Sequence, residues 1–255
     1  MIGLTRPIFG VPKNERVMDK SRVKKVLTAV QIVLAILVVV GVAWSAFKLI
    51  GYNQAQHVYQ EIESAYASQP VDGDPSSVNF EKLQMDFTGI KGWLKMDDVD
   101  VSYPIVQGED NEYYLHYDPH GNENIDGSIF MDYRNKSFND LHVLIYGHNM
   151  LDQSMFGLLP NYTSEEFYRN GTGAFTIFTP EGSYRYQIFA VDIVDPMDDV
   201  YQVGYQNPAV FDGFVKQLKA NSMYDTGVEV SGSDHVVTLS TCSDDDRLVL
   251  SAKRL

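Results

Sequence analysis

An uncharged apolar run from Val26 to Phe47 places the strongest constraint on how this chain folds. The run holds 22 residues, mostly Val, Leu, Ile and Ala, with a single glutamine, Gln31. As an α-helix, this length crosses about 30 Å of hydrocarbon, whereas the apolar core of a cleaved signal peptide usually has only about 7 to 15 residues. We therefore predict a transmembrane anchor, with a cleaved signal peptide as the alternative.

Charge is distributed unequally on the two sides of this run. Residues 1–25 contain seven basic and two acidic residues, a net charge of +5. Because the whole chain has a net charge of −14, residues 26–255 carry −19. Because basic flanks stay inside the cell, we expect a cytoplasmic N-terminus and an extracellular remainder. Such an acidic remainder argues against nucleic acid as a partner, since neutralising phosphates requires clustered Lys and Arg.

We divide the chain into four parts: residues 1–25 as a cytoplasmic basic tail, 26–47 as the transmembrane helix, 48–79 as a juxtamembrane helix and linker, and 80–255 as the extracellular folded domain. The juxtamembrane helix is predicted from apolar residues spaced by three and four: Tyr52, Ala55, Tyr59, Ile62 and Tyr66. We expect this stripe to pack on the domain, with a dimer seam as the alternative. Ser, Pro, Gly and Asp dominate from Ala67 to Asn79 and indicate a linker.

Short apolar runs separated by Gly, Pro, Asn and Asp predict a mainly β domain, either a barrel or a sandwich. The runs are Gly92–Leu94, Val99–Val106, Ser128–Met131, Leu141–Tyr146, Ala174–Thr179 and Tyr184–Ile193. One helix is expected, from Pro208 to Ser222, because Asn207 is a good N-cap and Pro208 suits the first turn. Its predicted apolar stripe contains Val210, Phe211, Phe214, Val215 and Leu218. This helix is an insertion that could form a wall of a substrate groove.

The single cysteine of the chain, Cys242, ends a β-rich run that starts at Val236. A second run begins at Arg247, and the four residues between, Ser243 to Asp246, predict a hairpin. In a regular hairpin Cys242 and Arg247 are cross-strand partners, with Cβ atoms about 5 Å apart. A thiol and a guanidinium placed in this way suit a nucleophile with an oxyanion stabiliser.

A lone cysteine on an apolar strand is more often a buried core residue than a nucleophile. Here Cys242 lies on the same strand face as Thr238 and Ser240, which is the more hydroxylated face. It also lies at the end of the strand, where pockets form. One cysteine also excludes an intramolecular disulfide framework and a multi-cysteine zinc site. Cys242 is thus available as a free, reactive thiol.

A thiol nucleophile needs a nearby base or cation, and histidine is the usual choice. His148 follows a predicted strand through Gly147, so that rigid backbone positions it at a strand end. His142 lies within the same strand, and we expect it to be structural. No pair of histidines has metal-ligand spacing on a helix, so we predict no metal site.

Several of these segments together resemble class B sortases. The resemblance covers about residues 80 to 255 and is strongest where the motifs follow one another in the same order. These motifs are Gly92–Leu94, Tyr103–Gln107, Asp110–Leu115, Gly127–Asn135, Tyr146–Met150, Ser154–Phe156, Thr238–Cys242 and Arg247–Leu250.

The resemblance implies a closed sortase-type β-barrel with an N-terminal helix and a helix inserted before the cysteine strand. It implies a membrane-anchored cysteine transpeptidase of the Gram-positive type, with no cofactor. In this reading Cys242 is the nucleophile, His148 the acid and base, and Arg247 the oxyanion and substrate-orienting residue. Ser240 and Thr241, which precede the cysteine, are assigned to substrate binding.

The implied partners are secreted proteins with a C-terminal sorting motif and an amine acceptor, either a peptidoglycan precursor or another protein. The alternatives are an extracellular cysteine hydrolase, a pilin-polymerising sortase and a non-catalytic membrane-tethered binding domain. One departure from the family is the short acidic loop Ser243–Asp246, which disfavours a thiolate unless it points into solvent. Asp244 could instead orient His148, and Arg254 is a weaker substitute for Arg247.

Overall fold

The computed structural model describes residues 20–67, 78–243 and 245–255, except the side chains of residues 20, 23, 48–50, 52–55, 242 and 243. Eight strands form a closed barrel in the order β1-β2-β3-β4-β7-β8-β6-β5. The strands are β1 (Ile90–Met96), β2 (Ser102–Val106), β3 (Ile129–Met131), β4 (His142–Tyr146), β5 (Ala174–Thr179), β6 (Gly182–Val194), β7 (Val236–Ser243) and β8 (Asp246–Arg254). The predicted mainly β fold and all eight predicted runs are confirmed.

Two of the barrel contacts are parallel, β2 with β3 and β4 with β7, and the others are antiparallel. Parallel strands cannot be joined by a tight hairpin, so they are connected by longer segments. The chain between β4 and β7 contains β5 and β6 and the helices η2 (Leu159–Thr163), α3 (Glu165–Asn170), η3 (Asp199–Tyr201) and α4 (Pro208–Asn221). The barrel interior is a continuous apolar core in which Trp93, Phe130 and Phe175 are fully or almost fully buried.

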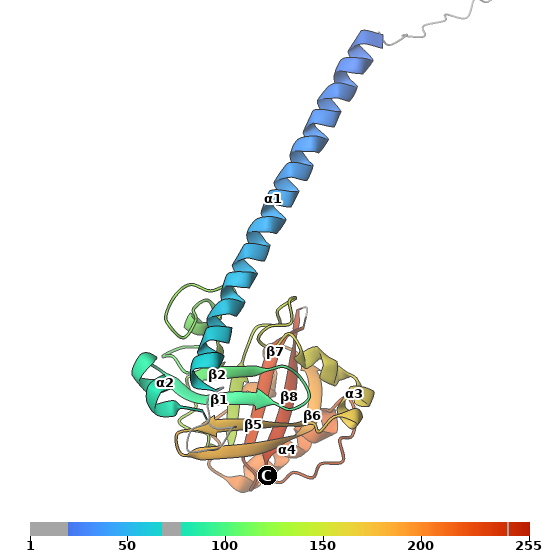
Figure 1. The fold of residues 1–255 in the computed structure, drawn as a ribbon. Helices are drawn as coiled ribbons and strands as arrows, with labels where there is room; N and C mark the ends of the chain where they lie inside the picture. Colours follow the sequence, from blue (N-terminus) through green and yellow to red (C-terminus); the bar gives the residue numbers. More distant parts are fainter. Residues whose placement is uncertain (1–19, 68–77, 244) are drawn as a thin grey trace, which may run out of the picture. The chain divides into compact units, whose positions relative to one another are not determined.

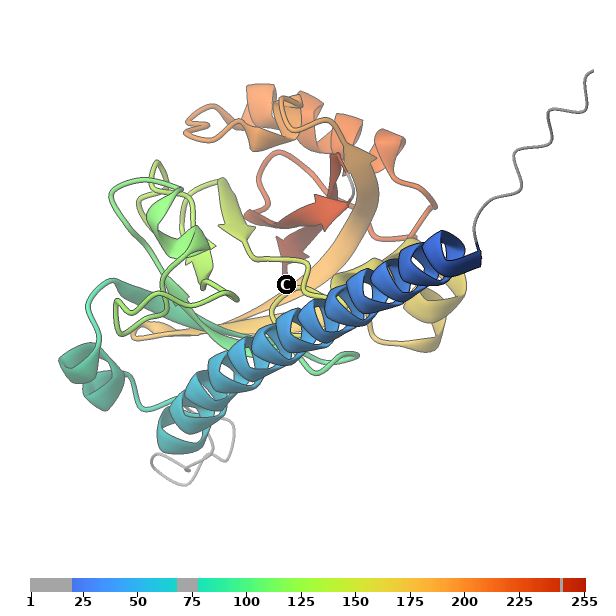
Figure 2. The same cartoon turned by 90° about the horizontal axis from the view of Figure 1, so that it is seen from above.

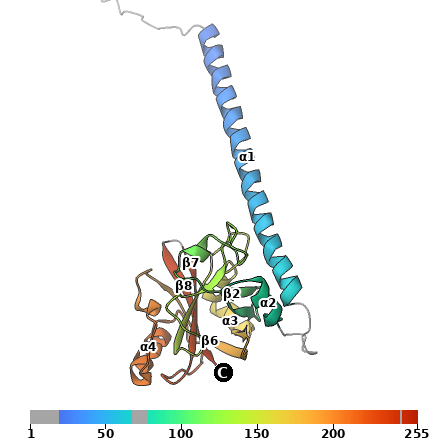
Figure 3. The same cartoon turned by 90° about the vertical axis from the view of Figure 1, so that its left-hand side faces the viewer.

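Two helices cover opposite sides of the barrel (Figures 2 and 3). One is α2 (Phe80–Asp86), and the other is α4, whose predicted cap is confirmed because Asn207 accepts a hydrogen bond from the Ala209 amide at 2.9 Å. Phe211, Phe214 and Val215 of α4 pack against Phe189 and Val236 of the barrel. The prediction was wrong for Val210, which is 61% exposed because the helix turns it away from the sheet.

The helix α1 spans Lys20–Tyr66, and contacts within the chain divide it between two units, Met1–Leu49 and Ile50–Leu255. Its segment Lys24–Phe47 is, among the described residues, the one stretch of helix long and apolar enough to cross a membrane. The part after Leu49 belongs to the second unit, where its end lies beside β2 and α2 (Figure 1). The predicted stripe packs there through Tyr59, Ile62 and Tyr66, which are nearly fully buried; the side chains of Tyr52 and Ala55 lie outside the described set.

The η1 helix (Tyr113–Leu115) and the loop that follows it lie between β2 and β3. Gly127 in this loop has a φ of +55°, and a Cβ atom there would lie 2.6 Å from the Tyr114 carbonyl oxygen and 2.7 Å from that of Leu115. Only glycine fits such a position without strain. The close packing holds the Leu115 carbonyl in place, and this carbonyl contacts the candidate site described next.

Candidate active site

The hairpin of β7 and β8 places Cys242 and Arg247 directly opposite each other, as predicted. The pairing continues to Ser243 and Asp246, so that two residues separate the strands and not the four expected. The ladder is therefore longer than the polarity of the segment suggested. Asp244, which was considered as a partner of His148, lies outside the described residues.

On its other side, β7 is paired in parallel with β4, and Tyr146 is the register partner of Ser240. The Gly147 amide extends this pairing by donating to the Ser240 carbonyl at 3.2 Å. His148 therefore follows β4 at the same level at which Cys242 follows Ser240 in β7. Since neighbouring strands lie about 4.8 Å apart, the backbone of Cys242 is flanked by that of His148 on one side and that of Arg247 on the other.

One backbone carbonyl holds the His148 ring, and one backbone amide holds the His148 main chain. Its Nε2 lies 2.8 Å from the Leu115 carbonyl oxygen, which can only accept, so in the neutral ring Nε2 carries the hydrogen and Nδ1 is left as an acceptor. The His148 carbonyl accepts from the Phe156 amide at 2.9 Å. Gly147 is required before it because a Cβ atom would collide with Ile129 and Phe156.

A pocket of about 420 Å³ opens beside these residues. Its walls contain His148, Arg247, Ser240 and Thr241, four of the five residues assigned to the site from the sequence; the side chain of the fifth, Cys242, is outside the described set. The other lining residues are Asn111, Leu115, Phe130, Tyr146, Gly147, Pro196 and Tyr201. No residue of α4 contributes, so the expectation that this helix walls the groove was wrong; the segment before it supplies Pro196 and Tyr201.

The two polar residues before the cysteine have different environments. The Ser240 hydroxyl is 3.0 Å from that of Tyr201. The Thr241 Oγ1 atom is buried and has no hydrogen-bond partner among the described residues. A buried hydroxyl without a partner is costly, so Thr241 is a candidate donor or acceptor for a bound molecule.

Buried Asp132 holds together one side of the pocket. Its carboxylate accepts hydrogen bonds from Asn111 Nδ2 and the Tyr146 hydroxyl, both at 2.9 Å, and from the Arg134 guanidinium at 2.7 and 2.8 Å. Arg134 also donates to the Tyr201 carbonyl at 3.0 Å. Despite its burial, these donors keep the pKa of Asp132 below its usual value. Three residues that line the pocket therefore depend on one carboxylate.

The remaining candidates lie away from this pocket. His142 is fully buried between Thr238 and the Gln202 carbonyl, and burial lowers its pKa to about 4, so it is a neutral structural residue, as expected. Arg254 packs over the Tyr184 ring and does not line the pocket. Within the described residues, no group of three or more His, Cys, Asp or Glu is arranged to hold a metal ion.

Sequence reasoning missed several lining residues. Asn111 and Tyr146 lie inside motifs that carried the family resemblance, so their part in the pocket could have been inferred from it. Pro196 and Tyr201 come from an irregular segment after β6, and no pattern in the sequence indicates that this segment reaches the pocket.

A closed eight-stranded barrel with a cysteine near a strand end, an arginine opposite it in the hairpin and a histidine just after the neighbouring strand is suited to acyl transfer by a thiol. Residues 94–255 match the sortase domain family. Sortase B of Listeria monocytogenes is 35% identical over 227 residues, which cover 81% of this chain and 87% of that protein. The chain belongs to the sortase family, in its class B, and is a sortase-type cysteine transpeptidase.

Solved structures agree with this assignment. Sortase B from B. anthracis in complex with AAEK1 has a TM-score of 0.74 and 32% identity, and the match covers 81% of this chain and 99% of that one. A substrate complex of Staphylococcus aureus sortase B has a TM-score of 0.69 and 28% identity, covering 81% of this chain and 98% of that one. The closed barrel predicted from the resemblance is therefore confirmed.

Proposed function

We propose that this transpeptidase cleaves a C-terminal sorting signal of secreted proteins and transfers them to an amine of the cell wall. The observation that carries the proposal is the strand order β4-β7-β8, in which Cys242 is flanked by the backbone of His148 and Arg247 at the edge of a pocket. Sortase B of Staphylococcus aureus, a relative with the same fold, has been solved in complex with its substrate, which supports a substrate-binding role for this fold.

In the first half-reaction, the Cys242 thiolate attacks the scissile carbonyl carbon and a tetrahedral intermediate forms. Arg247 and nearby backbone amides stabilise its oxyanion, a contribution that is usually the largest in acyl transfer. Protonated His148 gives its proton to the departing amine as the C–N bond breaks, and a thioacyl-enzyme remains.

In the second half-reaction, an amine of a peptidoglycan precursor or another acceptor attacks the thioester. His148, now neutral, takes the proton of the attacking amine, the C–S bond breaks, and the Cys242 thiolate and protonated His148 are restored. The Leu115 carbonyl holds Nε2–H of the neutral ring, which leaves Nδ1 as the nitrogen that exchanges the catalytic proton. Ser240 and Thr241 bind the substrate main chain or side chains from the pocket wall.

We further propose the membrane arrangement expected from the sequence. Residues 26–47, which lie within the apolar helical segment Lys24–Phe47, anchor the chain, residues 1–25 are cytoplasmic, and the domain from residue 80 acts outside the cell. The length and composition of this segment and the excess of basic residues before it support this orientation.

The test uses the full-length protein in detergent micelles, incubated with peptides that contain proline and threonine sorting motifs, with and without triglycine. Mass spectrometry is expected to detect an acyl adduct on Cys242 that resolves into a triglycine-extended product. The Cys242→Ala variant should form neither. Full peptide cleavage by Cys242→Ala would overturn the mechanism, and an adduct that yields only the hydrolysed peptide in the presence of triglycine would identify a hydrolase.

A further inference from the structure

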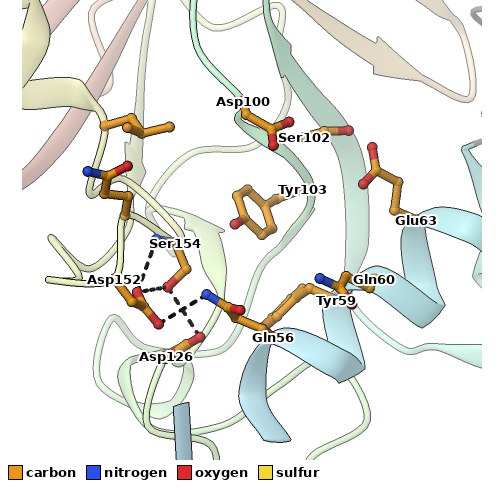
Figure 4. A pocket seen from close by; sticks show the side chains of 12 residues that line it. Gln56, Tyr59, Gln60, Glu63, Asp100, Ser102, Tyr103, Asp126, Asp152 and Ser154 are labelled. Carbon is orange, nitrogen blue, oxygen red and sulfur yellow. Dashed lines mark hydrogen bonds between the residues drawn. The ribbon is translucent and has the colours of Figure 1, made fainter. Parts of the chain in front are cut away.

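A second pocket, of about 330 Å³, lies between the C-terminal part of α1 and the barrel and shares no lining residue with the catalytic pocket (Figure 4). Four elements build it: α1, the start of β2, the loop before β3 and the segment that follows His148. The lining residues are Gln56, Tyr59, Gln60, Glu63, Asp100, Ser102, Tyr103, Asp126, Asp152, Gln153, Ser154 and Leu158.

The charge of this pocket has one sign. Glu63, Asp100, Asp126 and Asp152 line it, and none of the described lining residues is Lys, Arg or His. The rings of Tyr59 and Tyr103 meet edge to face, with centroids 5.4 Å apart, and add an aromatic wall. Carboxylates beside aromatic rings form a typical environment for an organic cation.

Asp126 lacks the donors that its burial requires. The residue is fully buried, and its Oδ1 atom has no hydrogen-bond partner among the described residues. Its Oδ2 atom lies 3.3 Å from the Ser154 hydroxyl, but that hydroxyl is 2.7 Å from Asp152 Oδ1. Because a serine hydroxyl has one hydrogen, the shorter bond to Asp152 takes it, and an ionised Asp126 is left without a donor.

Figure 4 shows Asp126, Asp152 and Ser154 gathered at one end of the pocket, where Gln56 reaches from α1. The Gln56 amide nitrogen donates to Asp152 Oδ2 at 3.2 Å, so its amide oxygen is an additional acceptor. A group with several N–H donors and a positive charge would satisfy this end of the pocket.

A metal ion fits less well than an ammonium group. The described residues contain no metal-binding arrangement of three or more His, Cys, Asp or Glu. The cavity is also much larger than a bare ion, and part of its wall consists of the Tyr59 and Tyr103 rings and Leu158. A primary ammonium on a short alkyl chain matches both the acceptors and this apolar wall.

We propose that this pocket binds a primary ammonium group, which donates to Asp126 and Asp152 while its alkyl chain packs against Tyr59 and Tyr103. The chemistry is that of a small free amine or of a lysine-type side chain on another polypeptide. The site does not depend on the transpeptidase mechanism proposed above.

Binding should depend on pH because it requires the ionised form of Asp126. Burial first, and the nearby Asp152 carboxylate second, raise the pKa of Asp126 to about 6. Affinity for an ammonium should therefore increase as the pH rises from 5 to 7.5 and the proton leaves Asp126. The other titratable groups around the site are Tyr59 and Glu63 of α1, Asp100 and Tyr103 at β2, Asp118, and Asp152. Burial raises the pKa of both tyrosines well above this window.

Isothermal titration calorimetry of the full-length protein in micelles tests the proposal. The probes are Nα-acetyl-lysine amide, n-butylamine, the neutral isostere Nα-acetyl-norleucine amide, and calcium chloride. Saturable binding is expected for the two amines and not for the isostere. Tighter binding of the lysine derivative would identify a polypeptide side chain as the source, and equal affinity would identify a small amine.

Asp126→Asn and Asp152→Asn should each weaken amine binding by about tenfold or more, and Asp126→Asn should also abolish the pH dependence. The matched control is Glu166→Gln, which neutralises an exposed carboxylate of α3 outside the pocket. Thermal unfolding checks that the variants are folded, and the wild-type pH series gives an answer without any variant. The proposal is overturned if the amines do not bind, if the neutral isostere binds equally well, if affinity does not change with pH, or if calcium alone binds.

Discussion

Two buried threonines on β7, Thr238 and Thr241, differ in whether their hydroxyl groups have hydrogen-bond partners. Thr238 is paired, since its hydroxyl lies 2.9 Å from both His142 Nε2 and the Ser251 hydroxyl. Thr241 lies three residues further along the same strand, is equally buried, and has no partner for its hydroxyl among the described residues. We propose that this unsatisfied hydroxyl, next to Cys242 in the chain, contacts a bound substrate.

Replacing Thr241 with valine should increase stability and reduce activity. Removing an unpaired buried hydroxyl is expected to stabilise the fold by about 1 kcal/mol, while loss of a substrate contact should lower kcat/KM by about tenfold. Thermal unfolding and peptide turnover measure the two effects. The matched control, Thr238→Val, breaks existing hydrogen bonds and should destabilise the fold by about 1 to 3 kcal/mol. Unchanged turnover in Thr241→Val would exclude a substrate contact.

Among the elements, one side of the pocket is assembled from separate segments that share Asp132. This residue follows β3 and connects the segment of Asn111, the end of β4 at Tyr146 and, through Arg134, the segment of Tyr201. It does not line the pocket itself. We therefore consider it a residue that positions the binding surface.

The Asp132→Asn variant should bind substrate poorly without losing its nucleophile. The amide cannot accept both charged hydrogen bonds of Arg134, so Tyr146 and Tyr201 should be held less firmly in the pocket wall. KM should therefore rise by about tenfold, with a smaller change in kcat. Steady-state kinetics separates the two constants, and the rate of Cys242 alkylation should stay at the wild-type value. Asp140→Asn, in the same connection between β3 and β4, is the control. A fall in kcat at constant KM would argue against the positioning role.

Local sequence patterns were sufficient for elements whose neighbours in space are also neighbours in sequence. Alternating residues and polar breaks located the eight strands, and Asn207-Pro208 located the start of α4. The opposition of Cys242 and Arg247 followed from hairpin geometry alone. In contrast, the position of His148 near the Cys242 end of β7 depends on the parallel pairing of β4 with β7, which no local pattern specifies. Only the family resemblance connected the two before the structure was known.

Other contacts around the two pockets also join residues that are distant in sequence, so no local pattern indicates them. The position of Tyr201 depends on hydrogen bonds to Arg134 and Ser240, which are distant in sequence. The second pocket forms where the C-terminal part of α1 contacts the barrel. There the Tyr59 hydroxyl donates to the Gly127 carbonyl. Amphipathic spacing predicted that this stripe packs on the domain but not which groups it meets.

For the whole molecule, the proposed membrane anchor predicts which parts of the chain can be reached from outside the cell. If residues 1–25 are cytoplasmic and the domain is outside, a protease added to intact protoplasts should digest the domain and leave a tag at the N-terminus protected. The apolar length of Lys24–Phe47 and the basic residues before it are the physical reason. Immunoblotting for tags at both ends measures the result. Protection of the C-terminal tag, or release of the domain from the membrane without protease, would contradict the anchored orientation.

The parallel pairing of β4 with β7 also has a consequence for how the enzyme comes into being. Contacts between segments so distant in sequence form late and slowly, because a long loop must close before they add stability. Cys242 and Arg247 lie on the last two strands, so a chain emerging from the ribosome N-terminus first contains His148 well before its thiol. On the proposed mechanism, Cys242 and His148 come together only when β4 pairs with β7, and a partly folded chain would therefore lack transpeptidase activity.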